Sequence, residues 1–214
     1  MLNNLELLEH YGFLLPRNPN DNVHIALPDS GEFGLSEVNP SLRVPGTACL
    51  EISGHPSFSL VAALRLRACH PSLLKAKGLL ALSGEQIFVQ SDILAYQWLE
   101  KKCKSLLGSL PTSLEDDFAL QKTVNSVLSC SALEDLAVSL GESPTKAKEV
   151  LESFRPCTSV DEVGAAMDEE NYGDRDKDFQ LERWKLVLNW RIGYKQIFRR
   201  CIHFCSKKVL YLSR

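Results

Sequence analysis

The chain has 214 residues, of which 44% are hydrophobic and 24% charged, and its formal net charge at pH 7 is −3. This composition is ordinary for a globular protein with a sizeable core, and the acidic balance argues against general nucleic-acid binding. No window reaches the run of about 18 apolar residues that crosses a bilayer, and the opening stretch MLNNLELLEH lacks the pattern of a secretory signal.

The first residues already have a helical pattern. Apolar residues recur from Leu5, and Asn3 or Asn4 can cap a short helix that ends near Tyr11, before Gly12. Because the sequence starts inside an element, we expect it to begin within a domain.

Two short strands are expected next. The turn signal at 18–21 precedes an alternation of apolar and polar residues over 23–27, and a second strand is expected at 48–52. The intervening residues 28–46 are rich in Gly and Pro, which predicts an irregular connection.

The rest of the chain has helical periodicity. Ser91 and Asp92 precede a long helix, Pro111 ends it, and Thr112 with Glu115 offers a capping box for the next helix. The expected helices cover 57–69, 73–82, a segment from 93 to 107, 112–128, 131–140, 143–154 and 178–212. The acid-rich stretch 156–178 is poor in large apolar residues and predicts a mobile loop.

Charge is distributed unevenly along the sequence. Residues 115–178 carry 16 acids and 6 bases, whereas 183–214 carry 9 Lys or Arg and no acid. Two interpretations remain open at this point. The final helix has either a solvated face that packs near an acidic loop or a basic surface that docks a partner. Trp184 and Trp190 could stack on nucleic-acid bases, but core positions are favoured.

The seven cysteines are scattered, and no Cys-x-x-Cys pair occurs. This usage is typical of reduced core thiols in a non-secreted, intracellular protein of the cytoplasm, nucleus or chloroplast. Cys201 and Cys205 share a helix face, but no second ligand pair accompanies them, so we predict core thiols and no metal site. The sequence also lacks a nucleophile motif and a glycine-rich phosphate loop.

The N-terminal segment carries the most informative motif. Residues 4–13 read NLELLEHYGF and residues 18–21 read NPND. The pattern N-x-E-L-L-x-x-Y-G-F followed by N-P-x-D resembles the end of the SET domain in the Rubisco large-subunit methyltransferase family of protein-lysine methyltransferases. The stretch LPTSLEDD, the pattern W-R-x-x-Y-K at 190–195 and the terminal Cys-x-x-x-Cys are similar to the plant SET-domain-group branch.

The resemblance implies a mainly α fold in three parts. Residues 1–28 would be the C-terminal end of the SET domain, a short α/β remnant. Residues 29–56 would be a connection with a possible short strand. Residues 57–214 would be the helical substrate-binding lobe of the Rubisco methyltransferase type.

The resemblance also implies roles for aromatic and basic residues. In the family, the aromatic residues that match Tyr11 and Phe13 line the lysine channel and cover S-adenosylmethionine. Phe13 would therefore contact the cofactor and Tyr11 the substrate, because aromatic faces attract a sulfonium or a methylammonium group. Alternatively, both rings only anchor the helix end in a core. Arg191 and Lys195 are the predicted substrate-binding cations.

The family's glycine-rich cofactor loop, its Asn-His motif and its catalytic tyrosine have no counterpart in this sequence. We therefore expect a C-terminal fragment with no catalytic residue, inactive by itself and binding no S-adenosylmethionine alone. The full-length parent would use that cofactor to methylate a lysine of a protein substrate. The alternative is a stand-alone, non-catalytic helical interaction module. A membrane partner is not expected, and a nucleic-acid partner is disfavoured.

Overall fold

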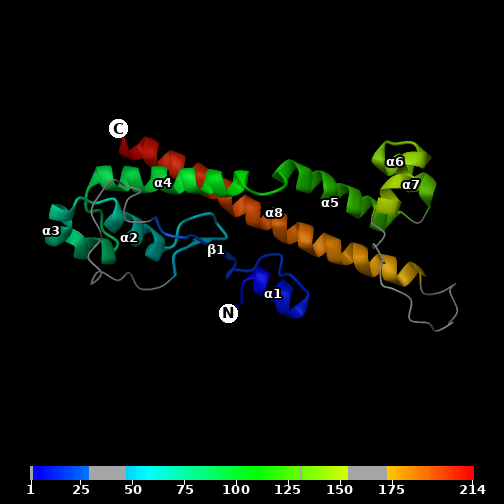
Figure 1. The fold of residues 1–214 in the computed structure, drawn as a ribbon, viewed down its shortest axis with the longest axis horizontal. Coiled ribbons are helices and arrows are strands. Elements are labelled where there is room, and N and C mark those ends of the chain that lie inside the picture. Colours follow the sequence, from blue (N-terminus) through cyan, green and yellow to red (C-terminus); the bar gives the residue numbers. More distant parts are fainter. Residues whose placement is uncertain (1, 29–46, 131, 154–172) are drawn as a thin grey trace. The chain divides into compact units, whose positions relative to one another are not determined.

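The computed structural model describes residues 2–28, 47–130, 132–153 and 173–214. These residues form helices and one two-stranded sheet, which confirms the predicted mainly α fold class (Figure 1). The strands are β1 (Asn22–His24) and β2 (Cys49–Glu51). The helices are α1 (Asn4–Tyr11), α2 (Phe58–Arg67), α3 (Pro71–Leu82), α4 (Val89–Gly108), α5 (Leu114–Ser129), α6 (Leu133–Leu140), α7 (Pro144–Ser153) and α8 (Gly173–Leu212).

The chain divides into two compact units. Unit 1 comprises Met1–Ser113 and Gly193–Arg214, and unit 2 comprises Leu114–Ile192. Each unit contains part of α8, since this helix continues past Ile192. None of the helices in the described residues is apolar over a length that could cross a membrane.

The core of unit 1 is built by α2, α4 and the C-terminal part of α8, and Figure 1 shows the last two side by side. Val23 and Ile25 of the N-terminal segment belong to the same core. The three-part division at residues 28 and 56 stays a prediction. The largest fully buried apolar side chains of this core are Leu50, Leu60, Leu64, Leu99 and Phe198. Burial of each such side chain contributes about 1.5–3 kcal/mol to folding.

The two strands pair antiparallel, with Val23 opposite Leu50. Both of these side chains are buried while His24 and Glu51 are exposed, as the two-residue period of a half-buried strand requires. The strands are shorter than the predicted 23–27 and 48–52, although Ile25 N still donates to the carbonyl oxygen of Ala48 at 3.0 Å.

Two predicted helix starts are wrong. The helix α4 begins at Val89, so Ser91 and Asp92 lie within its first turn instead of before it. The helix α8 begins at Gly173, so the last residues of the predicted loop 156–178 are helical. Acidic residues are favoured near a helix N-terminus, which explains how this acid-rich stretch enters the helix. The rest of that loop and the connection 29–46 lie outside the described residues.

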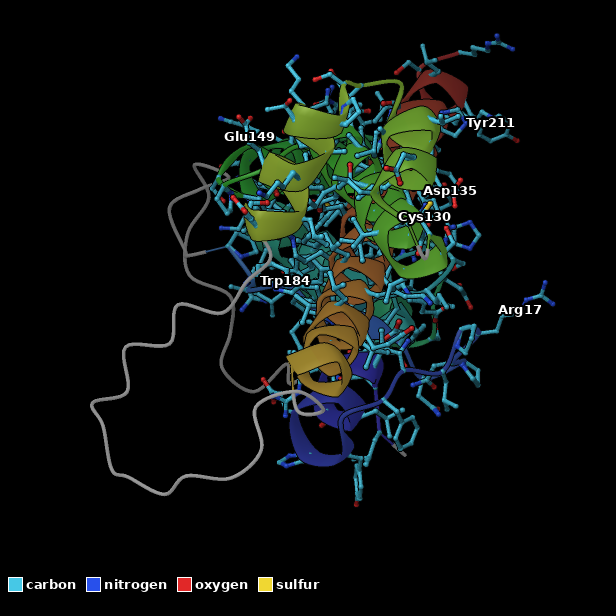
Figure 2. The ribbon with its side chains drawn as sticks, turned by 90° about the vertical axis from the view of Figure 1, so that its right-hand side faces the viewer. Arg17, Cys130, Asp135, Glu149, Trp184 and Tyr211 are labelled. Atoms are coloured by element: carbon cyan, nitrogen blue, oxygen red, sulfur yellow. The ribbon has the colours of Figure 1, made fainter. Side chains whose placement is uncertain are left out.

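Unit 2 has a smaller core between α5, α6, α7 and its part of α8. Its buried apolar residues are Val127, Leu136, Ala137, Ala147 and Leu181, with Cys130 partly buried against them (Figure 2). Trp184 is 43% exposed, so the core position predicted for it is wrong. The buried face of α8 is occupied there by Leu181 and Leu188, and Trp184 falls outside it.

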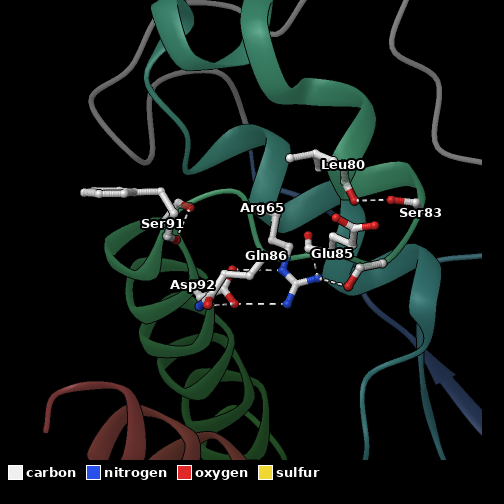
Figure 3. A network of polar contacts seen from close by, with 9 residues as sticks. Arg65, Leu80, Ser83, Glu85, Gln86, Ser91 and Asp92 are labelled. Carbon is white, nitrogen blue, oxygen red and sulfur yellow. Dashed lines mark hydrogen bonds and ion pairs between the residues drawn. The ribbon is translucent and has the colours of Figure 1, made fainter.

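One arginine connects three segments of unit 1 (Figure 3). Arg65 of α2 forms a two-point ion pair with Asp92 of α4, with Nε–Oδ1 and Nη2–Oδ2 distances of 2.8 and 3.0 Å. Its Nη1 also donates to the carbonyl oxygens of Gly84 and Glu85, in the turn between α3 and α4. Gln86 Nε2 donates to Asp92 Oδ2 at 3.1 Å. The side chains of Arg65 and Asp92 are only 12% and 4% exposed.

We predict that Asp92→Ala lowers the free energy of unfolding by about 3 kcal/mol, because it leaves the partly buried Arg65 guanidinium without its carboxylate. The measurement is urea unfolding followed by circular dichroism. Glu100→Ala is the matched control, since it removes a carboxylate of the same helix that pairs with the exposed Lys104. That control should change stability by less than about 1 kcal/mol. Equal losses in both variants would contradict a special role for the Arg65–Asp92 pair.

Candidate functional site

The segment with the motif consists of α1 and the loop that follows it. Asn3 caps the helix, because its side chain accepts from Glu6 N at 2.9 Å while Glu6 Oε2 accepts from Asn3 N at 2.8 Å. Gly12 ends the helix in a left-handed conformation with φ of 70°, which favours glycine. The predicted helix and its end are therefore confirmed, and of the two candidate caps Asn3 is the one used.

Polar motif residues tie the loop back onto α1. Asn4 and Leu15 exchange two hydrogen bonds of 3.0 Å between the amide side chain and the backbone. Asp21 accepts from Asn4 N at 2.9 Å and from Asn4 Nδ2 at 3.0 Å. Asn18 is almost fully buried and donates to the carbonyl oxygen of Leu2 at 3.0 Å. Buried polar groups need such partners, so this cluster, here called the polar knot (Asn4, Asn18 and Asp21), fixes the path of the segment.

The aromatic motif residues are displayed at the surface. Tyr11 is 64% exposed and Phe13 is 44% exposed, on either side of Gly12. Their ring centroids are 6.2 Å apart and their planes are inclined by 49°. The His10 ring meets Tyr11 edge-on at 6.4 Å. The alternative that both rings anchor the helix end in a core is therefore wrong for this structure.

The predicted substrate-binding cations have internal contacts. Lys195 is 2% exposed, and its Nζ donates to Thr112 O at 2.6 Å, Thr112 Oγ1 at 2.8 Å and Ser113 O at 3.0 Å. Arg191 lies in unit 2, where its Nη2 pairs with the buried Asp117. Contact between Lys195 and a protein surface would require its ammonium group to leave these three oxygens. Substrate binding by Arg191 and Lys195 stays a prediction.

The sequence predicts a possible helix cap at Asn4 and a turn at 18–21, but not the contacts that join them. Their signal was present, because Asn and Asp next to Pro favour turns in which the side chain bonds the nearby backbone. The partners of Asn4 lie 11 and 17 residues away. Such contacts depend on how the loop folds back, and the motif alone does not specify them.

The cysteines near the C-terminus lie in the core of unit 1. Cys103, Cys201 and Cys205 are fully buried, with 3.9 Å between the sulfurs of Cys201 and Cys205. Hydrogen bonds with Cys103 and Cys205, together with burial, raise the pKa of the Cys201 thiol. All three sulfurs lie within the hydrophobic core, which confirms the core-thiol interpretation of Cys201 and Cys205. Within the described residues, no group of three or more His, Cys, Asp or Glu is arranged to hold a metal ion.

Neither a protein-family model nor a solved structure matches the chain. Among curated proteins, the chain is similar to Protein SET DOMAIN GROUP 40 of Arabidopsis thaliana, with 31% identity over 209 residues. The match covers 96% of this chain. The similarity supports the SET-domain methyltransferase family. The chain spans 40% of the length of that relative.

The similarity to the Arabidopsis protein extends over both compact units of this chain. Because the match covers 96% of this chain, it reaches both units. The family relationship therefore does not rest on the short N-terminal motif alone. It includes the helices of unit 2, for which the sequence pattern by itself was weak support.

We predict that Cys103, Cys201 and Cys205 react with iodoacetamide at least about 100-fold more slowly than Cys49 and Cys130, because buried thiols react only after local or global opening. Mass spectrometry of peptides from the native protein measures the rates, and labelling in guanidinium chloride is the control for intrinsic reactivity. Rapid native labelling of Cys201 would contradict its burial.

We predict that Asn4→Ala lowers the free energy of unfolding by about 1–3 kcal/mol, because it removes the hydrogen bonds of a buried amide to the Leu15 backbone and to Asp21. The Leu15 amide should also lose its protection from hydrogen exchange, measured by NMR. Tyr11→Ala is the control and should change stability by less than about 0.5 kcal/mol, since the ring is exposed. A Leu15 amide that stays protected in Asn4→Ala would show that the polar knot does not hold the loop.

Proposed function

We propose that this chain is the C-terminal, substrate-binding part of an S-adenosylmethionine-dependent protein-lysine N-methyltransferase of the Rubisco large-subunit methyltransferase type. The similarity to the Arabidopsis SET-domain-group protein supports the family, and the motif of residues 4–21 supports the branch. The observation that carries the proposal is the exposed pair Tyr11 and Phe13, held in place by the polar knot.

The aromatic pair suits the chemistry of methyl transfer. S-adenosylmethionine, bound by the parent enzyme, supplies an electrophilic methyl group on a positively charged sulfur. That methyl group would pass to the neutral amine of the lysine, and the sulfur would leave as a neutral thioether. In this proposal the Phe13 ring covers the cofactor and the Tyr11 ring lines the entry of the lysine. Aromatic faces attract the sulfonium of the cofactor and the methylammonium of the product, and they keep water out of the site.

The proposal places the chain on one side of the parent's active site. A ring that is largely exposed in this chain would become covered when the cofactor and the lysine side chain lie against it. The polar knot then has a functional consequence. It orients the residues on both sides of Gly12 through backbone contacts and needs no support from the rings themselves.

The helical units would contribute the surface that holds the protein substrate. We propose that Arg191 and Lys195 act as positioning residues there. Lys195 joins α8 to the segment after α4, and Arg191 joins α8 to α5. Each bond therefore fixes the rotation of α8 within its own unit, and this rotation decides which side chains α8 presents to a partner.

The test is a chimera in which this chain replaces the matching segment of the Arabidopsis relative. With tritiated S-adenosylmethionine and a plant protein extract, we expect transfer of label to protein lysines. Tyr11→Ala with Phe13→Ala should lower this transfer by about 10- to 100-fold, because each cation–π contact contributes about 0.5–2 kcal/mol. Phe118→Ala is the matched control, since Phe118 is an exposed ring in unit 2, and it should have little effect.

Two outcomes would contradict the proposal. If the unaltered relative transfers label and the folded chimera does not, the chain acts as a non-catalytic helical interaction module. If the chain alone binds S-adenosylmethionine in calorimetry, the expectation that another part of the parent provides the cofactor pocket is wrong.

A further inference from the structure

The C-terminal part of α8 has a basic outer face. Arg199, His203 and Lys207 follow one another at four-residue intervals and are exposed. Leu210 and Tyr211 are exposed farther along the helix, and Figure 2 labels Tyr211. Four-residue spacing places side chains on one side of a helix. The opposite side, with Phe198, Cys201 and Cys205, is fully buried in the core of unit 1. We call these five exposed residues the basic face.

Charge in the chain is divided between the units. Unit 1 contains 15 Lys or Arg and 10 Asp or Glu, and unit 2 contains 9 and 17. Together these counts are the 24 bases and 27 acids of the whole chain. The net charges are therefore +5 and −8, and residues 193–214 contain six Lys or Arg and no acid. An acidic partner is attracted to unit 1 over a longer range than the contact itself.

Two further cations flank the basic face and are held by internal contacts. Arg200 Nη1 donates to the carbonyl oxygen of Ile52 at 2.8 Å, and the Nζ atom of Lys208 lies 5.6 Å from the centroid of the Phe204 ring. Both side chains are exposed at their ends. They add positive potential next to the basic face while helping to fix the helix.

We propose that the basic face binds an acidic, amphipathic segment of a partner protein. The cations supply the electrostatic contact, and Leu210 and Tyr211, which are 66% and 74% exposed, supply apolar contacts at the same end. From Arg199 to Tyr211 the face is about 18 Å long, which suits a short peptide segment. A long nucleic acid is less well suited, because the apolar residues would remain unused.

The proposed function enters at one point: it identifies the partner as the substrate that is methylated. The binding itself belongs to the basic face of unit 1 and requires neither cofactor nor methyl transfer. The partner that we assign is a protein segment in which Glu or Asp alternates with large apolar residues, the complement of the cations and the exposed Leu210 and Tyr211.

The test uses the whole chain and a fluorescein-labelled peptide of repeated Leu-Glu-Glu-Leu, followed by fluorescence anisotropy. We expect a micromolar Kd that weakens as NaCl is raised from about 50 to about 200 mM, because salt screens the attraction. Arg199→Glu with Lys207→Glu should weaken binding at least about 10-fold. Lys122→Glu with Lys148→Glu is the control of equal charge change at exposed positions in unit 2, and it should change Kd by less than about 2-fold.

A second variant tests the same face in case Arg199→Glu with Lys207→Glu does not fold. Leu210→Ser with Tyr211→Ser leaves the charge unchanged at exposed positions, and it should weaken binding about 3- to 10-fold through lost apolar contact.

Absence of peptide binding, or an equal loss in the control variant, would overturn the inference. Equal affinity for a 20-nucleotide DNA or for phosphatidylserine vesicles would overturn it as well, since the face would then be a general polyanion surface. An active chimera that fails to bind the peptide overturns this inference alone, and an inactive chimera that binds it contradicts only the proposed function.

Discussion

Unit 1 depends on the packing of the apolar face of α8 against α4 and α2. Phe198, Cys201 and Cys205 fill this face without any exposed surface. The same core receives Val23 of the N-terminal segment, so the short sheet is covered by helices that come from distant parts of the sequence. A face this tightly packed tolerates no rotation of the helix. The rotation of α8 is therefore fixed, and with it the set of side chains that point outward.

The helices and their order could be predicted from the sequence because apolar residues recur with a helical period and because Gly12 and Gly141 terminate helices in left-handed conformations. Helix starts were less predictable. Asp92 has the residue type of a cap, but it bonds to Arg65, which is 27 residues earlier. A carboxylate near a helix start can satisfy either the backbone or a distant arginine, and only the tertiary structure decides between them.

The position of the candidate site in the sequence was predictable, but its local structure was not. The motif identified the segment with Tyr11 and Phe13, yet it did not indicate whether the rings lie in a core or at the surface. Their exposure follows from the polar knot, in which Asn4 bonds Leu15 and Asp21 across the loop. Since amides and a carboxylate hold the loop, its position does not require the burial of aromatic rings. Polar motif residues thus support the structure, and the aromatic ones remain exposed.

The cations of α8 show why a count of charges does not locate a binding surface. Lys195 and Lys207 lie on the same helix in the same run without acids, but Lys195 is buried with its ammonium group bound by three oxygens. Its oxygen partners are 82 and 83 residues away in sequence. Lys207 is exposed because its position falls opposite Cys205 and Phe198 on the helix. The packing of apolar side chains therefore decides which cations lie on the outer face, and Arg199 and Lys207 are among them.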